Sequence, residues 1–374
     1  MLKELAESFV SNGHSMSVIT FSHDIDSELM KENIEGVSII RLKVSNPKYS
    51  KIKRALVELS YSKKIIKFIK KNDLENVDAL IFFSPSIFFG QAVNFIKSFY
   101  SIKSYLIVRD IFPDWLVKIK QLNKGLIYYF FKIYEYINFR SANFIGTESI
   151  ADIQHVTKII GSKNIEVEQL RNWFSRPRNT NNNVSEKELV LRSKINLVYG
   201  GSLGLAQNIV SFLTTLEKQE SSKFLNLTIV GDGVQKLELE EFSKRSKMDI
   251  NIMPMMERGD YFDLVSKSDA GLVVLDKNLE ANNYPGKSFD YMYCKKPLFC
   301  FLHENNEFGK LIEKEDLGYF IKANQNEVFE DLLNSLVKDE KLRNLKGENA
   351  YSYLNKYFSA ENAFIQIENK FLKK

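Results

Sequence analysis

The segment 284–291, with the sequence YPGKSFDY, combines a predicted break in the chain with a cation. Pro285 and Gly286 favour a turn immediately before a helix, so Lys287 falls in the first helical turn. That end of a helix favours anions, and a lysine there is electrostatically out of place unless it faces a negatively charged ligand. We therefore predict that Lys287 pairs with a phosphate. Asp290 would lie near the same face, where it could accept hydrogen bonds from ribose hydroxyls or be an ordinary surface carboxylate.

Two glycine-rich turns come earlier in the chain, each directly after an apolar segment. Residues 200–204 (GGSLG) follow INLVY, and residues 231–233 (GDG) follow LTIV. Glycines between a strand and a helix let backbone N–H groups approach an anion, although each segment could also be only a tight turn. Both turns would lie at the carboxyl ends of parallel strands, where open α/β sheets bind ligands. Asp232 could hold a base or ribose edge, or could cap the following helix.

The elements that must position these residues alternate between apolar strands and amphipathic helices. In the first half the predicted strands are 15–21, 37–42, 79–83, 104–108, 143–147 and 164–170, with helices at 48–71, near 87–100 and at 114–140. In the second half the predicted strands are 195–201, 225–233, 249–253, 269–275, 297–302 and 318–322. Such alternation predicts parallel sheets with right-handed crossovers. We therefore expect an α/β protein of two Rossmann-like domains that face a cleft, joined by a linker in the Asn-rich segment 171–190.

The composition excludes several other classes of protein. Two Cys and four His in 374 residues rule out a disulfide scaffold, and no zinc-type spacing can be assembled from them. No Ser-His-Asp set and no metal cluster is evident, so we expect neither a metal nor another cofactor. The sequence has no run of 18 apolar residues, and MLKELAESFV lacks a signal-peptide core, which predicts a cytoplasmic protein.

The motifs, taken in order, resemble family 4 of the retaining GT-B glycosyltransferases, in its bacterial surface-polysaccharide (O-antigen and capsule) branch. The resemblance covers nearly the whole chain and is carried by NGHSMSVIT, IVRDIFPDW, GGSLGLAQN, TIVGDG and YPGKSFDYM. It implies a GT-B fold with an acceptor domain at 1–175, a linker at 176–190 and a nucleotide-sugar domain at 191–355. Residues 356–374 would pack back on the first domain.

The resemblance also implies roles for individual residues of the second domain. Backbone groups of the first glycine turn, at Gly201, Ser202 and Gly204, would surround the donor diphosphate. Gly231 and Gly233 would let the nucleotide approach, and Lys287 would pair with the diphosphate and act in catalysis. Asp290 stands where the family usually has a glutamate that binds ribose. The sequence departs from the family at Asn282, where a second glutamate is usual, and at Gln207, where many members carry a basic residue.

The first domain would hold the acceptor. Arg109 and Asp110 follow a predicted strand and would face the cleft, with Arg109 contacting substrate. Asp110 is the catalytic candidate that would orient or deprotonate the acceptor hydroxyl. Its alternative role is to cap, together with Asp114, the helix that follows Pro113.

The expected reaction transfers a sugar, with retention, from a nucleotide diphosphate donor (a UDP-sugar) to a lipid-linked saccharide of a surface polysaccharide. One alternative is a UDP-sugar 2-epimerase of GT-B shape, which would need further acid–base side chains. Another is a non-catalytic nucleotide-sugar-binding partner of a polysaccharide assembly complex. The degenerate pair Asn282 and Asp290 motivates this last alternative.

The net charge of +5 comes from the first half of the chain and is concentrated in one segment. Residues 48–71 hold nine basic residues and one acid, together with an apolar helical face. Such a local excess argues against a nucleic-acid-binding protein and predicts contact with an anionic membrane surface, so the protein would be peripheral on the inner face of the plasma membrane. The aromatic segment 117–140 is expected to pack mostly into the core.

The chain is also expected to lack the first strand of its first domain. It begins inside a helix, and the resembling family has a strand and a glycine turn before the equivalent of LKELAESFVSNGH. Segments 15–21 and 79–83 would then flank an unfilled position in the sheet, unless residues 37–42 fill it.

Overall fold

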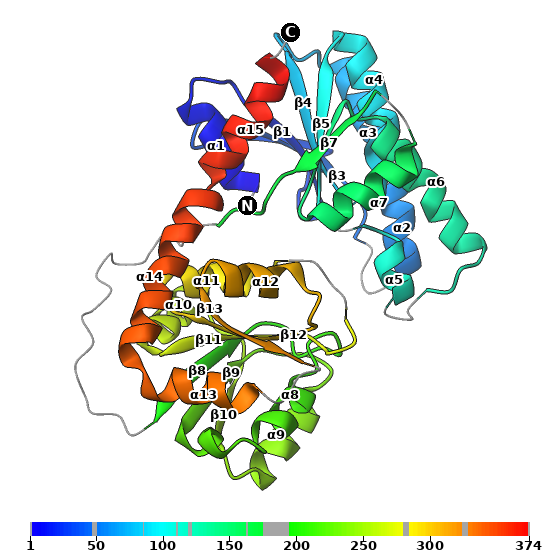
Figure 1. Cartoon of the computed structure of the whole chain (residues 1–374). Helices are drawn as coiled ribbons and strands as arrows, with labels where there is room; N and C mark the ends of the chain where they lie inside the picture. Colours follow the sequence, from blue (N-terminus) through cyan, green and yellow to red (C-terminus); the bar gives the residue numbers. More distant parts are fainter. Residues whose placement is uncertain are drawn as a thin grey trace. The chain divides into compact units, whose positions relative to one another are not determined.

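The computed structural model describes residues 2–46, 51–84, 86–109, 111–118, 122–161, 164–174, 194–279, 284–323 and 328–372. The chain divides into two compact units, which are coloured along the sequence in Figure 1. Unit 1 comprises Met1–Trp173 and Ala360–Lys374, and unit 2 comprises Phe174–Ser359. Each unit contains parallel β-sheet covered by helices, which confirms the predicted α/β class.

Unit 1 contains two sheets. The first has the order β1-β3-β2 and is formed by β1 (Ser17–Ser22), β2 (Leu29–Ile34) and β3 (Val37–Lys43). The second is parallel, has the order β4-β5-β6-β7, and is formed by β4 (Ala79–Ser84), β5 (Lys103–Val108), β6 (Phe144–Thr147) and β7 (Glu166–Gln169). Within the described residues no strand pairing joins β1 to β4. The alternative in which residues 37–42 fill this position is wrong, because β3 pairs with β1 on one side and β2 on the other.

The strand β2 was not predicted, and it runs antiparallel to β3. The two strands are joined by Glu35 and Gly36, whose φ angles are +52° and +84°. Positive φ at both central residues is the geometry of a type I′ hairpin turn, which matches the twist of the strands it connects. The Glu-Gly pair between two alternating segments was therefore the signal for this hairpin.

The helices of unit 1 follow the predicted order, except that two of the predicted helices are each divided into two. They are α1 (Leu2–Ser11), α2 (Lys51–Leu59), α3 (Tyr61–Lys71), η1 (Ile87–Phe89), α4 (Gly90–Tyr100), α5 (Asp114–Lys118), α6 (Leu126–Arg140), α7 (Ile150–Ile160) and α15 (Ala360–Leu372). The predicted helix 48–71 is thus two helices, and the predicted helix 114–140 is α5 followed by α6. The last helix, α15, packs on α1, where the rings of Phe9 and Phe364 lie 4.8 Å apart.

The apolar faces of α3 and α6 are used differently from the prediction. Ile65, Phe68 and Ile69 of α3 are buried in a cluster with β3 and α4, so the lysines of this helix lie on a solvated face. In α6 a row of large apolar side chains is exposed instead, among them Leu126 and Ile133. The prediction that segment 117–140 packs mostly into the core is therefore wrong for the outward face of α6.

Unit 2 is built on one six-stranded parallel sheet with the order β10-β9-β8-β11-β12-β13. Its strands are β8 (Ile195–Gly200), β9 (Leu225–Val230), β10 (Asp249–Met253), β11 (Ala270–Val274), β12 (Leu298–Leu302) and β13 (Gly318–Lys322). The helices are α8 (Ile209–Leu216), η2 (Glu220–Phe224), α9 (Lys236–Arg245), α10 (Arg258–Lys267), α11 (Lys287–Tyr293), α12 (Glu307–Lys314), α13 (Phe329–Lys338) and α14 (Glu340–Tyr357).

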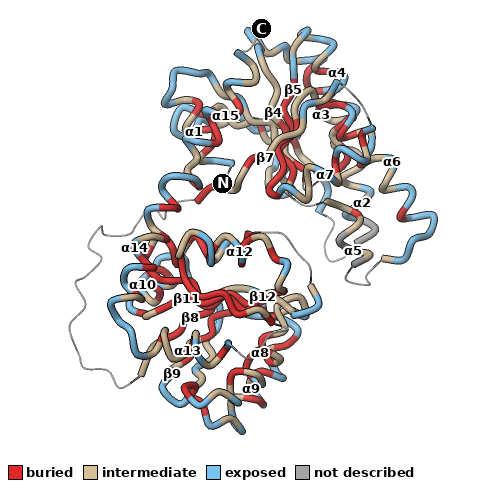
Figure 2. The backbone as a smooth tube through the Cα atoms, in the orientation of Figure 1, coloured by how far each residue is buried: buried red, intermediate tan, exposed pale blue. Residues whose placement is uncertain are grey.

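The sheet of unit 2 is buried on both faces, as its near-continuous apolar strands predict. Figure 2 shows β8, β11 and β12 as buried backbone in the middle of the unit. Successive side chains point to opposite faces, so Leu272 belongs to one hydrophobic cluster and Val273 to the other. The two clusters hold the strands of this sheet in place. The candidate site lies at the carboxyl ends of these strands.

Candidate functional site

The strand order of unit 2 reverses between β8 and β11. From β8 the chain continues to β9 and β10 on one side, and from β11 it continues to β12 and β13 on the other. Strand β8 pairs with β9 as far as Gly200 but with β11 only at Leu197 and Val198. The two central strands therefore separate toward their carboxyl ends, which is the position where open α/β sheets bind ligands.

A tyrosine hydroxyl bridges the two strands where they separate. The hydroxyl of Tyr291 accepts a hydrogen bond from the Gly200 N–H at 3.1 Å and donates to the carbonyl of Leu272 at 3.3 Å. The Tyr261 hydroxyl lies 3.2 Å from it. A Cβ atom at Gly200 would lie 2.2 Å from the Tyr261 hydroxyl oxygen, and one at Gly271 would lie 2.0 Å from the Tyr291 ring. Both glycines are therefore needed for the aromatic side chains to lie this close to the strands.

The two glycine turns pack directly against each other. A Cβ atom at Gly231 would lie 2.0 Å from the carbonyl oxygen of Gly201, a contact that real Cβ atoms do not show. The Gly201 N–H donates to the Val230 carbonyl, and the Leu203 N–H donates to the Asp232 carbonyl, both at 2.9 Å. Gly201 and Gly233 have φ angles of +131° and +154°, where glycine has no steric penalty. The sequence predicted the two turns but not that each fixes the backbone of the other.

Ser202, Gly204 and Asp232 occupy the rims of these turns. The Gly204 N–H lies 3.3 Å from the side-chain oxygen of Gln207, and the Ser202 carbonyl accepts a hydrogen bond from the Tyr199 hydroxyl at 2.7 Å. Asp232 is exposed, and its carboxylate accepts a hydrogen bond from the Gly233 N–H at 2.9 Å. The Lys236 Nζ atom lies 3.8 Å from the same carboxylate. The described contacts of Asp232 therefore stabilise its own turn.

Lys287 lies against the first glycine turn, as its predicted role requires. It is the first residue of α11, and its Nζ atom lies 3.5 Å from the centre of the Tyr199 ring. A Cβ atom at Gly201 would lie 3.3 Å from the same Nζ. Burial lowers the pKa of Lys287 to about 7, and no carboxylate among the described residues forms an ion pair with it. A desolvated amine without an anion is a site that a phosphate group would complete.

Asp290 lies one helical turn further along α11 and pairs with Arg258, the first residue of α10. Their closest atoms, Arg258 Nη2 and Asp290 Oδ1, lie 3.3 Å apart. Burial raises the pKa of Asp290 to about 6, and the charge of Arg258 opposes this shift. Arg258 was not among the predicted site residues, because nothing in the local pattern MMERGDYF connects it with α11. Next to Lys287, the Ser288 hydroxyl is buried and has no hydrogen-bond partner among the described residues.

In unit 1, Arg109 bonds to the backbone of its own unit. Its guanidinium donates to the carbonyl oxygens of Leu170 at 2.7 Å and Arg171 at 3.4 Å, and lies 5.0 Å from the centre of the Trp173 ring. Burial lowers the pKa of Arg109 to about 10. The described contacts therefore tie β5 to the segment after β7. Asp110, the predicted catalytic residue, lies outside the described residues, as does Asn282.

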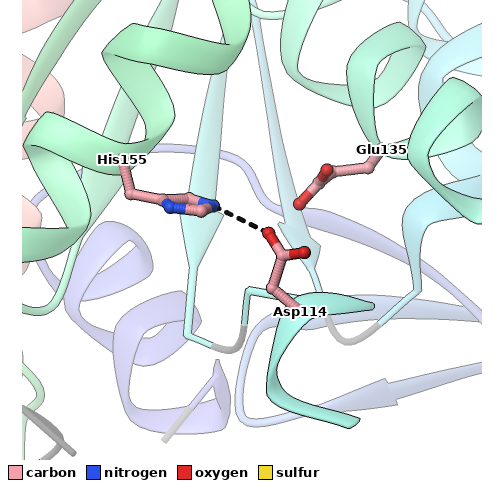
Figure 3. A group of neighbouring side chains, drawn as sticks. All are labelled: Asp114, Glu135 and His155. Atoms are coloured by element: carbon pink, nitrogen blue, oxygen red, sulfur yellow. Dashed lines mark ion pairs between the residues drawn. The ribbon is translucent and has the colours of Figure 1, made fainter. Parts of the chain in front are cut away.

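Unit 1 also contains an ionic cluster that the sequence analysis missed. Asp114, Glu135 and His155 come from α5, α6 and α7, and one ligand atom of each lies within 4.8 Å of the others (Figure 3). His155 Nε2 lies 3.0 Å from Asp114 Oδ2, and Lys132 lies 3.1 Å from the same oxygen and also pairs with Glu135. The three ligand types would suit a divalent metal, but the Lys132 ammonium already pairs with both carboxyl groups. The cluster therefore ties three helices together.

The spacing of these residues along the chain gives no local motif, since each lies on a different helix. Burial raises the pKa of Glu135 to about 7, although Lys132 opposes the shift. The His155 imidazole, the Tyr128 hydroxyl and Lys132 hold the pKa of Asp114 well below its ordinary range. The cluster thus contains one carboxyl group that resists ionisation and one that favours it.

The comparison with known proteins rests on structure alone. Neither a protein-family model nor a curated protein sequence matches this chain. Sucrose-phosphate synthase from Thermosynechococcus elongatus matches with a TM-score of 0.72 and 10% identity, over 99% of this chain and 91% of that one. Trehalose-6-phosphate synthase from E. coli, bound with UDP-2-fluoro glucose, matches with a TM-score of 0.73 and 10% identity, over 100% and 95%. WaaG, a glycosyltransferase involved in lipopolysaccharide biosynthesis, matches with a TM-score of 0.64 and 12% identity, over 98% and 94%.

The chain has the GT-B fold. In the second unit of this GT-B protein, Lys287 and both glycine turns lie at the carboxyl ends of the central strands, where the sequence placed the donor. Within the described residues, no helix is both long enough and apolar enough to cross a membrane.

Proposed function

We propose that this GT-B protein is a glycosyltransferase that moves a sugar from a nucleotide diphosphate donor, a UDP-sugar, to a hydroxyl acceptor. The observation that carries the proposal is Lys287, whose partly desolvated amine lies against Gly201 without an anionic partner in the described part of the chain. The similar trehalose-6-phosphate synthase structure bound with UDP-2-fluoro glucose supports a UDP-linked donor.

The geometry suits stabilisation of a diphosphate leaving group. When the bond from the sugar to the diphosphate breaks, negative charge develops on the phosphate oxygens, and Lys287 would neutralise it at the edge of the sheet. The Tyr199 ring beneath the amine holds the side chain in place through a cation–π contact. A phosphate bound at Lys287 would raise the pKa of the amine and so keep it protonated. The chemistry assigned to these residues requires no divalent metal.

The remaining donor contacts are assigned to the turns and to Asp290. Gly201, Ser202 and Gly204 would line the diphosphate, and Gly231 and Gly233 would give the nucleotide room. Asp290 would accept hydrogen bonds from the ribose hydroxyls. Arg258 would then have to share or release the Asp290 carboxylate. Arg109 and Asp110 belong to the proposed acceptor side, where Asp110 would orient or deprotonate the acceptor hydroxyl.

The acceptor we propose is a lipid-linked saccharide of a surface polysaccharide. Its support is the resemblance to the surface-polysaccharide branch of family 4, together with the structural similarity to WaaG, which acts in lipopolysaccharide biosynthesis. Retention at the anomeric carbon follows from the same resemblance. The protein would then act at the inner face of the plasma membrane, where such lipids are extended.

A second candidate function is a non-catalytic subunit that binds a nucleotide sugar. It is favoured by the ion pair between Asp290 and Arg258, because Arg258 occupies the carboxylate that would otherwise bind the ribose. The experiment that separates the two incubates the protein with a panel of UDP-sugars and a membrane lipid extract and measures UDP release. Release that depends on the lipid extract and persists in EDTA supports the transferase, and UDP binding without release supports the binding subunit.

A further inference from the structure

Helix α6 carries its apolar side chains on the outside of unit 1. Six large apolar residues of this one helix are between 40% and 92% exposed: Leu126, Ile127, Tyr129, Phe130, Ile133 and Tyr136. Leu126 is the most exposed of them, at 92%. A row of this kind on one helix is an exposed hydrophobic patch, and such patches mark contact with another protein or a membrane.

The opposite face of the same helix is buried and mixed, because Tyr128 and Phe139 lie there together with polar side chains. Glu135 and Asn138 are completely buried, and Lys132 reaches inward to Asp114 and Glu135. A helix that covers a core in water normally buries its apolar face and exposes its polar one. α6 departs from this pattern, because polar side chains share its buried face and a row of large apolar side chains is exposed, so the outward face is matched to an apolar surrounding rather than to water.

The charges around α6 select among possible partners. Between residues 122 and 141 the only acidic residue is Glu135, which is buried, while Lys124 and Arg140 are exposed at the two ends of the helix. A second copy of the helix, in either orientation, would bring basic ends together. An anionic surface would be attracted by both ends at once.

The exposed residue types indicate that the anionic surface is a lipid bilayer. The face combines Leu and Ile side chains with Tyr and Phe rings and is flanked by basic groups, which is the pattern of helices that lie in the membrane interface. Arg140 lies over the Tyr136 ring at 5.9 Å, which leaves its charge at the edge of the apolar face. Neutral apolar partners would not account for basic residues at both ends.

We propose that α6 docks unit 1 on an anionic phospholipid bilayer, with Leu126, Ile127, Phe130 and Ile133 inserted among the acyl chains. Helix α3 adds only electrostatic attraction, because Ile65, Phe68 and Ile69 are buried in the core. This relocates the membrane surface that the sequence placed at residues 48–71. The proposal does not rest on the donor site, since no residue of the Lys287 site lies in unit 1.

The test measures co-sedimentation of the full chain with vesicles of phosphatidylglycerol and phosphatidylcholine, and with vesicles of phosphatidylcholine alone. The wild type is expected to bind the mixed vesicles and to bind the neutral ones less. The triple variant Leu126→Ser, Ile127→Ser and Ile133→Ser should lose at least about tenfold in affinity. It removes three of the apolar side chains that would be inserted in the bilayer. The unfolding temperature of each variant, measured in solution, shows whether it is folded.

A matched control removes three exposed apolar residues elsewhere in the chain: Leu237→Ser, Leu345→Ser and Leu372→Ser. This control should bind as the wild type does. Equal binding by the α6 variant and the wild type, or no binding by the folded wild type, would overturn the proposal. So would a wild-type dimer in solution that the α6 variant abolishes, because the face would then be an interface between copies.

Discussion

At the scale of single residues, the pKa of Lys287 makes nucleotide binding depend on pH. Burial lowers this pKa to about 7 in the protein without ligand, and a bound diphosphate would raise it. The amine is charged up to about the lower value, so UDP affinity should be greatest near pH 7 and should fall as pH rises toward the higher value. The UDP phosphates are fully ionised above about pH 7 and contribute no change of their own in this range.

The expected loss of affinity approaches about tenfold per pH unit above about pH 7, until the pH reaches the pKa of the amine in the complex. Calorimetric titration of UDP at several pH values measures it directly. Lys287→Arg keeps a permanent positive charge, so its affinity should vary much less over the same range. Identical pH profiles for the wild type and this variant would exclude titration of Lys287 as the cause.

At the scale of elements, the two glycine turns should lose their conformation if a side chain is introduced where they touch. Gly231→Ala would place a Cβ atom 2.0 Å from the Gly201 carbonyl oxygen. The backbone must shift, and such overpacking costs about 1–3 kcal/mol. We therefore expect a lower unfolding temperature and weaker UDP binding than in the wild type.

The matched control for this change is Gly259→Ala in α10. No atom lies within 4 Å of the Cβ position at Gly259, and its backbone is helical. This variant should leave stability unchanged or raise it by up to about 1 kcal/mol, since alanine favours a helix more than glycine does. If both variants unfold at the wild-type temperature, the close packing of the turns is not as described.

Glu135, in the cluster that joins α5, α6 and α7, should lower the stability of the fold as pH rises. An ordinary ion-paired carboxylate has the opposite effect. Glu135 has its pKa raised to about 7 in the folded state, from about 4.5 when exposed. The folded state therefore binds a proton more strongly than the unfolded state, and this residue lowers stability as pH rises from about 4.5 to about 7.

Glu135→Gln should remove this dependence. The difference in unfolding temperature between the wild type and the variant should shift in favour of the variant as pH increases across that window. Glu348→Gln, on the exposed surface of α14 where it pairs with Lys295, is the control and should show no such shift. A constant difference between the wild type and Glu135→Gln at all pH values would contradict the raised pKa.

At the scale of the whole molecule, the alternation of strands and helices made the fold predictable from the sequence. All six strands of unit 2 were located, because parallel strands buried on both faces form long apolar runs. Strand β2 was missed, since the middle of residues 29–34 (LMKENI) is polar and only the Glu-Gly turn signals the hairpin.

The parts of the site that depend on tertiary contact were not predictable. Lys287 was singled out because its local motif makes a cation conspicuous. Arg258 was not, because it meets Asp290 only once α10 and α11 pack together. The outward face of α6 was misassigned for a similar reason: aromatic residues occur all around this helix, and periodicity does not show that Glu135 and Asn138 are buried while most of the apolar residues are not. Contacts between elements decide these questions, and a single sequence does not contain them as a local pattern.

The central claim is that the carboxyl end of the unit 2 sheet binds a nucleotide diphosphate through Lys287. Calorimetric titration of UDP into the wild type, Lys287→Ala and the exposed-lysine control Lys310→Ala tests it most directly. A charged hydrogen bond to phosphate contributes about 1.5–3 kcal/mol, so Lys287→Ala should weaken binding by at least about tenfold at an unchanged unfolding temperature, while Lys310→Ala binds as the wild type does. An unchanged dissociation constant for Lys287→Ala, or a folded wild type that does not bind UDP, would contradict the claim.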